Sequence, residues 1–246
     1  MSAVLSPHPQ AVGCEHRVGG ARLVLLPELA VWLPEQRTLL VADVHLGKAA
    51  SFRRFGVPVP RGTSSESLDR LGALARACGA ARIVVLGDFL HSAHAHCAST
   101  LGALARWRAA HADLAVTLVR GNHDAHAGDP PASAAIEVVD EPHFLPGLPG
   151  LALCHHPQPV AGAYVLAGHW HPCASIASRA GDRLRLPCFW FGDAAARPVG
   201  ILPAFGSFTG KHPIDAAAGD RVWLIGDGRV VEWPRRAQPS ASNLTR

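Results

Sequence analysis

Short apolar runs alternate with amphipathic segments through the first half of the chain. Runs of β-branched and aliphatic residues predict strands over residues 23–31, 38–41, 82–86 and 114–119. Helical periodicity predicts helices over residues 64–78 and 98–111, with Thr63 or Ser64 as the N-cap of the first. This order of strand, helix, strand, helix, strand is typical of an α/β sheet.

The second half of the chain has shorter apolar runs and predicts mainly strands. These are expected over residues 136–139, 151–154, 164–166, 183–186, 199–203, 222–225 and 230–232. Gly226-Asp227-Gly228 between the last two runs is a hairpin signal. The whole pattern predicts an α/β fold with two packed mixed β-sheets flanked by helices. We expect a single domain over residues 1–234 and a polar, disordered tail over residues 235–246.

Composition narrows the class of protein. The 246 residues are 48% hydrophobic, which is enough for one sizeable core, and the formal charge of +4 is compatible with an anionic substrate. The six cysteines show no CxxC spacing, which favours small buried side chains in a reducing cytosol. The sequence shows no secretory signal and no apolar stretch of ~18 residues, so we expect a cytoplasmic protein without a membrane span.

Histidine is the unusual component, with 15 residues against one Tyr and one Met. Many of the histidines lie in short motifs that follow predicted strands. The motifs are Asp43-x-His45, Gly87-Asp88, Gly121-Asn122-His123-Asp124, His155 and Gly168-His169-Trp170-His171. Because strand ends converge at one edge of an open α/β sheet, these side chains are expected to meet there. Each motif alone is weak evidence of metal binding, but their order and their positions after strands together predict a metal site.

The donor types allow two four-residue metal shells that share only one carboxylate. The first would use Asp43, His45, Asp88 and His171, and the second would use Asp88, Asn122, His155 and His169. Two cations about 3.5–4 Å apart activate a bridging water and clamp phosphate oxygens during in-line displacement. His123 would then be free to contact phosphate or to protonate the leaving oxygen, with Asp124 orienting its ring. His155 is preferred to His156 as a ligand because it follows its strand directly.

The motif order DxH, GD, GNHD, H, GHxH resembles that of the calcineurin-like metallophosphoesterase superfamily, over residues 41–172. The resemblance implies a four-layer fold of two sheets between helices. It also implies a dinuclear metal site, and it supports His123 as the acid or phosphate contact.

Longer strings resemble the ligase-associated DNA damage response endonucleases (PdeM type). They are DVHLGK from Asp43, FRRFGVPVPRG from Phe52, YVLAGHWHP from Tyr164 and LPAFGSFTG from Leu202. The resemblance implies a DNA phosphodiesterase that acts in repair in functional association with a DNA ligase and a helicase. Two positions depart from the pattern, Lys211 and His156, and neither is a proposed ligand. The resemblance favours Mn as the metal, although the mixed ligands also suit Fe or Zn.

Substrate-binding candidates lie near the DxH loop. Lys48, Arg53 and Arg54 could bind phosphate, and His91 follows Asp88 closely. The alternation of cations and aromatic rings in Phe52-Arg53-Arg54-Phe55 is equally compatible with nucleic-acid binding and with a solvated basic loop. The ligand set does not distinguish a diesterase from a phosphomonoesterase or nucleotide phosphatase. A non-catalytic metal-binding scaffold is the alternative outside the enzymes, and the sequence does not determine the oligomeric state.

Overall fold

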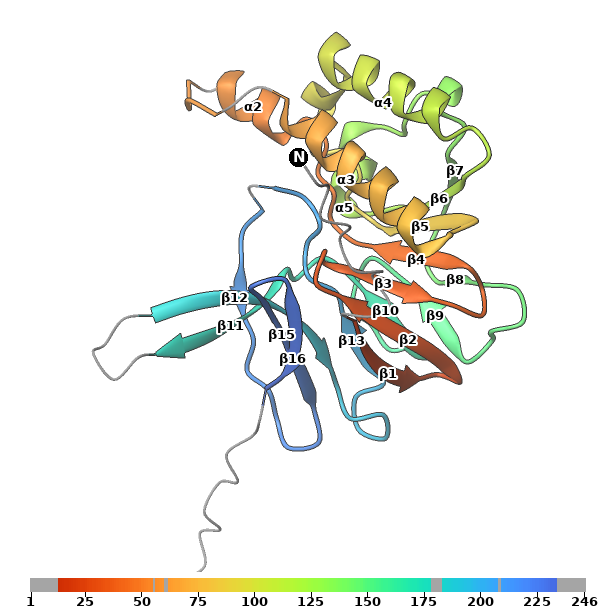
Figure 1. Ribbon diagram of the computed structural model, residues 1–246, viewed down its shortest axis with the longest axis vertical. Helices are drawn as coiled ribbons and strands as arrows, with labels where there is room; N and C mark the ends of the chain where they lie inside the picture. Colours follow the sequence, from red (N-terminus) through yellow and green to blue (C-terminus); the bar gives the residue numbers. More distant parts are fainter. Residues whose placement is uncertain (1–12, 55, 60–61, 178–182, 208, 234–246) are drawn as a thin grey trace, which may run out of the picture.

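The computed structural model describes residues 13–54, 56–59, 62–177, 183–207 and 209–233, and Figure 1 shows their arrangement. A seven-stranded sheet has the strand order β1-β2-β3-β4-β5-β6-β7. Its strands are β1 Cys14–Val18, β2 Ala21–Leu26, β3 Ala30–Leu33, β4 Thr38–Val41, β5 Arg82–Leu86, β6 Ala115–Val119 and β7 Glu137–Val139. The first four strands pair antiparallel, and β4 to β7 pair parallel, so the carboxyl ends of β4, β5 and β6 lie at one edge.

A nine-stranded mixed sheet is built from the second half of the chain. Its main path runs β14-β11-β12-β13-β10-β9-β8, and β15 pairs with β12 and β16. The strands are β8 His143–Phe144, β9 Leu151–Leu153, β10 Tyr164–Ala167, β11 Pro172–Ala177, β12 Arg183–Phe191, β13 Val199–Ile201, β14 His212–Pro213, β15 Arg221–Gly226 and β16 Arg229–Glu232. Strands β9, β10 and β13 are mutually parallel, so a second set of carboxyl ends gathers at one edge.

The two sheets pack face to face, and helices cover the other face of the first sheet. The helices are α2 Lys48–Arg54, α3 Thr63–Cys78, α4 Ala98–Ala110 and α5 Asn122–Ala127, with 3₁₀ turns η1 Ala93–His96 and η2 Ala132–Ala134. Side chains alternate along the strands, so Leu40 packs in the core between the sheets while Leu39 and Val41 pack in the core under the helices. Figure 1 shows α3 and α4 together beside β4 to β6.

The expected α/β architecture of two packed mixed sheets is confirmed. Within the described ranges no helix follows η2, so the helices cover one sheet only. The fourth layer that the resemblance implied is therefore not seen in this part of the chain. An apolar cluster that includes Trp190, Val199 and Ile201 occupies the outer face of the second sheet instead.

Local differences from the sequence prediction have simple causes. The single strand expected over residues 23–31 is two strands, β2 and β3, because a turn intervenes in which Leu29 has a φ of 67°. The N-cap of α3 is Gly62, with a left-handed backbone, rather than Thr63 or Ser64. Strands β1, β8, β11 and β14 and helix α2 were not predicted, because they are short or lack periodicity. The hairpin at Asp227-Gly228 is confirmed, with Gly226 paired to Arg229.

Several predictions concern residues that are not described. These residues are the tail over residues 235–246, Phe55, Pro60 and Arg61 in the FRRFGVPVPRG string, and Phe208.

All six cysteines are free, and four of them are buried. No helix in the described part of the chain has the length and apolar character needed to cross a bilayer.

Candidate metal centre

The candidate ligands lie on loops that directly follow the parallel strands. Five of them have left-handed backbone conformations, with φ between 48° and 70°: Asp43, His45, Asp88, His169 and His171. Non-glycine residues adopt this conformation at a cost of about 1–3 kcal/mol, and such strain gathers at functional sites. The loops are therefore held in an unusual shape by their surroundings.

Backbone hydrogen bonds tie these loops together. The amide of Asp43 donates to the carbonyl of Gly87 (3.1 Å), and the amide of His45 donates to the carbonyl of Asp88 (2.8 Å). The amide of Gly168 donates to the carbonyl of His155 (3.1 Å). The amide of Gly206, which follows β13, donates to the carbonyl of Asp43 (3.0 Å), so loops from both sheets are joined around the predicted ligands.

The first predicted shell gathers around the carboxylate of Asp43, which is fully buried. Its Oδ1 lies 3.3 Å from Nε2 of His171, and both oxygens accept hydrogen bonds from the amide of His169. Donor atoms of Asp43, His45 and His171 lie within 4.8 Å of one another. Nε2 of His45 lies 3.8 Å from Oδ2 of Asp88, the carboxylate predicted to be shared.

The second predicted shell gathers around Nε2 of His155. This nitrogen lies 2.9 Å from Oδ1 of Asn122, 3.0 Å from Nδ1 of His169 and 3.5 Å from Oδ1 of Asp88. The other ring nitrogen, Nδ1, donates to the carbonyl of Leu86 (3.1 Å), which leaves the lone pair on Nε2. That tautomer is the one a metal-binding imidazole needs.

Two features indicate that the residues fit cations. Donor atoms bonded to one cation at about 2.1 Å lie about 3.0–3.4 Å apart, and the atoms around Nε2 of His155 have similar separations. Nε2 of His45 and Nε2 of His171 are buried without a hydrogen-bond partner among the described residues. Buried polar atoms are normally paired, so these nitrogens are consistent with a ligand that they face.

Burial favours the neutral form of three of the candidate histidine ligands. It lowers the pKa of His45 strongly, with further lowering by Lys48, and it lowers the pKa of His155 and of His169. Burial, followed by the nearby charge of Asp43, raises the pKa of Asp88. Bound cations would offset this cost of burying two carboxylates together, and neutral imidazoles are the form that binds metal.

His123 lies beside the two shells at the rim of the site. Its Nδ1 donates to the carbonyl of His91 (2.7 Å), and its Nε2 lies 4.0 Å from Oδ2 of Asp88. The ring of His91 stacks on that of His123, with centroids 5.0 Å apart, and Nδ1 of His91 lies 3.3 Å from Nδ1 of His45. Nε2 of His123 is therefore directed to the site, as its predicted role requires.

The predicted role of Asp124 requires correction. This buried carboxylate does not orient the His123 ring, which the His91 carbonyl holds instead. Asp124 accepts hydrogen bonds from the amides of Leu90 (2.9 Å) and Gly121 (3.0 Å). It therefore fixes the β5 and β6 loops relative to each other rather than acting on the ring.

The basic residues near the DxH loop differ in position. Lys48 is half-buried, and its pKa is lowered by burial and raised in part by Asp43 and Asp88, so its ammonium interacts with these carboxylates. Arg53, in the last turn of α2, donates to the carbonyl of Val59 in the segment after the helix, and Arg54 is exposed. Lys48 is thus linked to the site by its charge interactions.

Sequence reasoning missed Glu141. Its carboxylate accepts hydrogen bonds from the amides of His155 (2.7 Å) and His156 (2.9 Å), and it pairs with Nδ1 of His156 (2.7 Å). Nδ1 of His156 is therefore held by Glu141, although the His156 ring stays beside the cluster, with its centroid 4.8 Å from that of His169. Donor atoms of His155, His156 and His169 lie within 4.8 Å of one another, so His156 lies next to the second predicted shell. An isolated Glu far from any motif gives no signal in a sequence.

Two packed mixed sheets with a buried His and Asp cluster at their strand ends define a phosphoesterase-like protein. The crystal structure of Pseudomonas putida nuclease MPE is similar to this chain, with 42% identity and a TM-score of 0.76, covering 90% of this chain and 100% of that one. The chain therefore belongs to the same family as nuclease MPE. No protein-family model and no curated protein matches the sequence.

Proposed function

We propose that this protein is a dinuclear metal-dependent phosphodiesterase that cleaves DNA internally. The observation that carries the proposal is the convergence of seven donor side chains from five loops, with two buried imidazole nitrogens that face the site unpaired among the described residues. The similarity to a chain described as a nuclease supports a nucleic-acid substrate.

The proposed ligand shells are those expected from the sequence. Asp43, His45 and His171 would hold one cation, Asn122, His155 and His169 would hold the other, and Asp88 would bridge the two. Two bound cations neutralise phosphate charge and activate water for in-line attack on phosphorus. We favour Mn, with Fe or Zn as alternatives, because the donor set mixes imidazole nitrogen with oxygen.

The remaining side chains would supply a proton or positive charge to the substrate. His123 donates from Nδ1 to the His91 carbonyl, which leaves Nε2 facing the site. When the ring is protonated at both nitrogens, Nε2 can contact the phosphate or give its proton to the leaving oxygen, and the ring then remains as the neutral imidazole. The ammonium of Lys48, which already interacts with Asp43 and Asp88, would add positive charge near the phosphate. Arg53, Arg54 and His91 are further candidates for contacts with the substrate.

A turnover assay tests this function. Metal-free protein should hydrolyse bis-p-nitrophenyl phosphate and circular DNA only after Mn is added, and cleavage of a circle without ends reports internal cuts. His123→Ala should lower kcat by about 10²- to 10⁴-fold, because it removes the proton donor and no ligand. Metal content measured by atomic emission should stay at the wild-type level in this variant.

Two further variants serve as controls for this assay. His94→Ala changes an exposed histidine of η1 and should retain wild-type activity. Asp88→Asn should abolish turnover together with metal binding, which excludes a contaminating nuclease. Mn-independent turnover, or full activity in His123→Ala, would show the proposal to be wrong. Faster hydrolysis of monoesters than of every diester would favour a phosphatase.

The proposed biological role is DNA repair in functional association with a ligase and a helicase. It is supported by the resemblance of the strings around Asp43, Tyr164 and Leu202. A strain that lacks this protein should survive DNA damage poorly, and wild-type protein but not His123→Ala should restore survival. Equal rescue by both proteins would remove the catalytic role in repair.

A further inference from the structure

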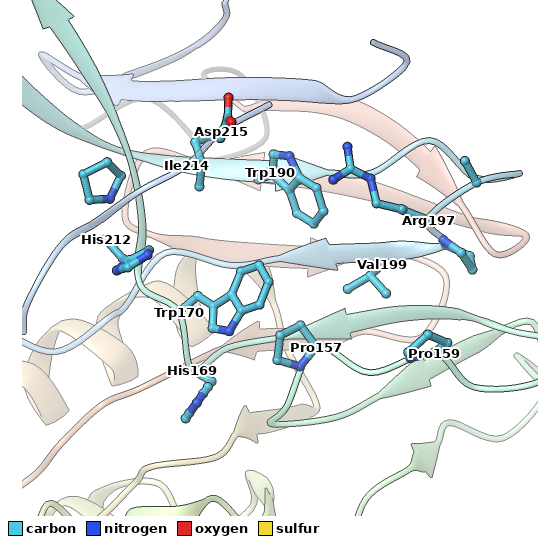
Figure 2. A pocket seen from close by; sticks show the side chains of 13 residues that line it. Pro157, Pro159, His169, Trp170, Trp190, Arg197, Val199, His212, Ile214 and Asp215 are labelled. Carbon is cyan, nitrogen blue, oxygen red and sulfur yellow. The ribbon is translucent and has the colours of Figure 1, made fainter. Parts of the chain in front are cut away.

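A cavity of about 630 Å³ lies on the outer face of the second sheet and reaches the metal centre. Its walls include Pro157, Trp170, Trp190, Val199 and Ile214, and His169 lies at one end. Figure 2 shows the indole of Trp170 between His169 and Trp190. Because His169 is also a candidate metal ligand, a molecule in this cavity would lie directly beside the reacting phosphate.

Most of the cavity wall is fixed by the fold. The indole nitrogen of Trp190 donates to the buried carboxylate of Asp220 (3.1 Å), and the guanidinium of Arg197 pairs with the same carboxylate. The amide of Ile214 donates to the carbonyl of Cys173 (3.0 Å), which holds the segment after β14 against β11. The cavity is thus a formed site rather than a gap between loose segments.

Trp170 differs from the buried tryptophans of this protein because its side chain is exposed. Trp107, Trp190 and Trp223 are buried, whereas Trp170 is 48% exposed although it lies between two candidate ligands in the sequence. Its amide donates to the carbonyl of Gly168 (2.8 Å), so its position is set by the same turn that sets His169. A large exposed ring held beside a metal centre is the kind of platform on which nucleobases stack.

We propose that this cavity is a subsite for one nucleobase of the nucleic-acid substrate, stacked on the indole of Trp170. The proposal rests on the proposed function, because it assumes that a phosphodiester of a nucleotide chain occupies the metal centre. The apolar walls suit a planar ring, and cavities of this size commonly hold small ligands. Arg197, His212 and Asp215 add polar groups to the lining, which can meet the edge of a base.

The test compares two diesters with the same leaving group, thymidine 5′-(p-nitrophenyl phosphate) and methyl p-nitrophenyl phosphate. Stacking of a base on an aromatic side chain corresponds to a difference of about fivefold or more in binding. We expect the wild type to show at least this advantage in kcat/KM for the thymidine ester. Trp170→Ala should lose the advantage, and Trp170→Phe should keep most of it because a ring remains.

Phe144→Ala is the matched control, since Phe144 is a second exposed ring and lies on β8. It should leave the ratio of the two kcat/KM values unchanged. The subsite is overturned if the wild type shows no advantage for the thymidine ester. It is also overturned if Trp170→Ala lowers both values equally, which would mean that the indole only supports the His169 turn.

A binding measurement separates failure of the subsite from failure of the proposed function. If the wild type hydrolyses no diester, the proposed function fails, and binding of free thymidine then decides the subsite. Saturation-transfer NMR should detect thymidine but not 2-deoxyribose on the wild type, and neither on Trp170→Ala. Equal signals for thymidine on both proteins would overturn the subsite.

Discussion

At the scale of single residues, burial decides which form of histidine this protein contains. His91 illustrates the effect, because burial, with help from Lys48 and His123, lowers its pKa to about 4. A neutral ring keeps a lone pair for a cation or a hydrogen bond. Burial also lowers the pKa of His16. Because His16 is not a candidate ligand, its titration can be studied apart from metal binding.

His16 should make the stability of the protein depend on pH. Burial against Phe191, together with the charge of Arg221, lowers its pKa from 6.5 to about 4. The unfolded chain therefore binds a proton at a higher pH than the folded protein does, and the free energy of unfolding should fall as pH decreases from 6.5 to 4. In His16→Phe the free energy of unfolding should decrease by roughly 1–2 kcal/mol less than in the wild type as the pH falls.

Urea unfolding at several pH values between about 4 and 7 measures this contribution. The wild type and His16→Phe should differ increasingly as the pH falls. Parallel curves for the two proteins would show that His16 does not titrate differently on folding.

At the scale of elements, glycines allow the strand-end loops to approach one another. Gly87 follows β5 with a φ of 77°, and a Cβ added there would lie 2.1 Å from Nδ1 of His155. A Cβ at Gly121 would lie 2.4 Å from Oδ1 of Asp88. Side chains at these positions would push the candidate ligands apart, so the proposed metal site depends on the lack of side-chain atoms there.

Gly87→Ala should weaken metal binding through this contact. The substitution should also destabilise the fold by about 1–2 kcal/mol from its left-handed backbone alone. Gly79→Ala is a matched control, because Gly79 has a φ of 66° and open space around its Cα. Isothermal titration with Mn should show a lower affinity only for Gly87→Ala, and equal affinities in the two variants would contradict the proposed crowding.

At the scale of the whole molecule, the two sheets meet at the candidate metal centre. Asp43, His45 and Asp88 follow strands of the first sheet, while His155, His169 and His171 follow strands of the second. The amide of His169 donates to the Asp43 carboxylate, which links the two halves directly. Cations held by both halves would therefore stabilise the packing of one sheet on the other.

Removal of metal should lower the melting temperature. A ligand present at about 100 times its Kd stabilises the folded state by about 2.7 kcal/mol, which corresponds to about 5–10 °C for a protein of this size. Calorimetry with and without a chelator measures the shift, and Asp88→Asn should show a much smaller one. The same melting temperature with and without Mn in the wild type would argue against cations held between the sheets.

The α/β class, most strands and the candidate ligands could be predicted from the sequence alone, because apolar periodicity and polar strand ends are local properties. The hydrogen bond from Leu90 to Asp124 and the position of Glu141 depended on packing between residues distant in the chain, whereas the split of residues 23–31 comes from a local turn at Leu29. Asp124 adjoins His123 in the chain, yet its carboxylate caps the amide of Gly121 in the same turn and accepts from the amide of Leu90, which only folding brings close. The cavity beside Trp170 likewise arises only when the chain folds, because its walls come from strands and loops that are far apart in the sequence.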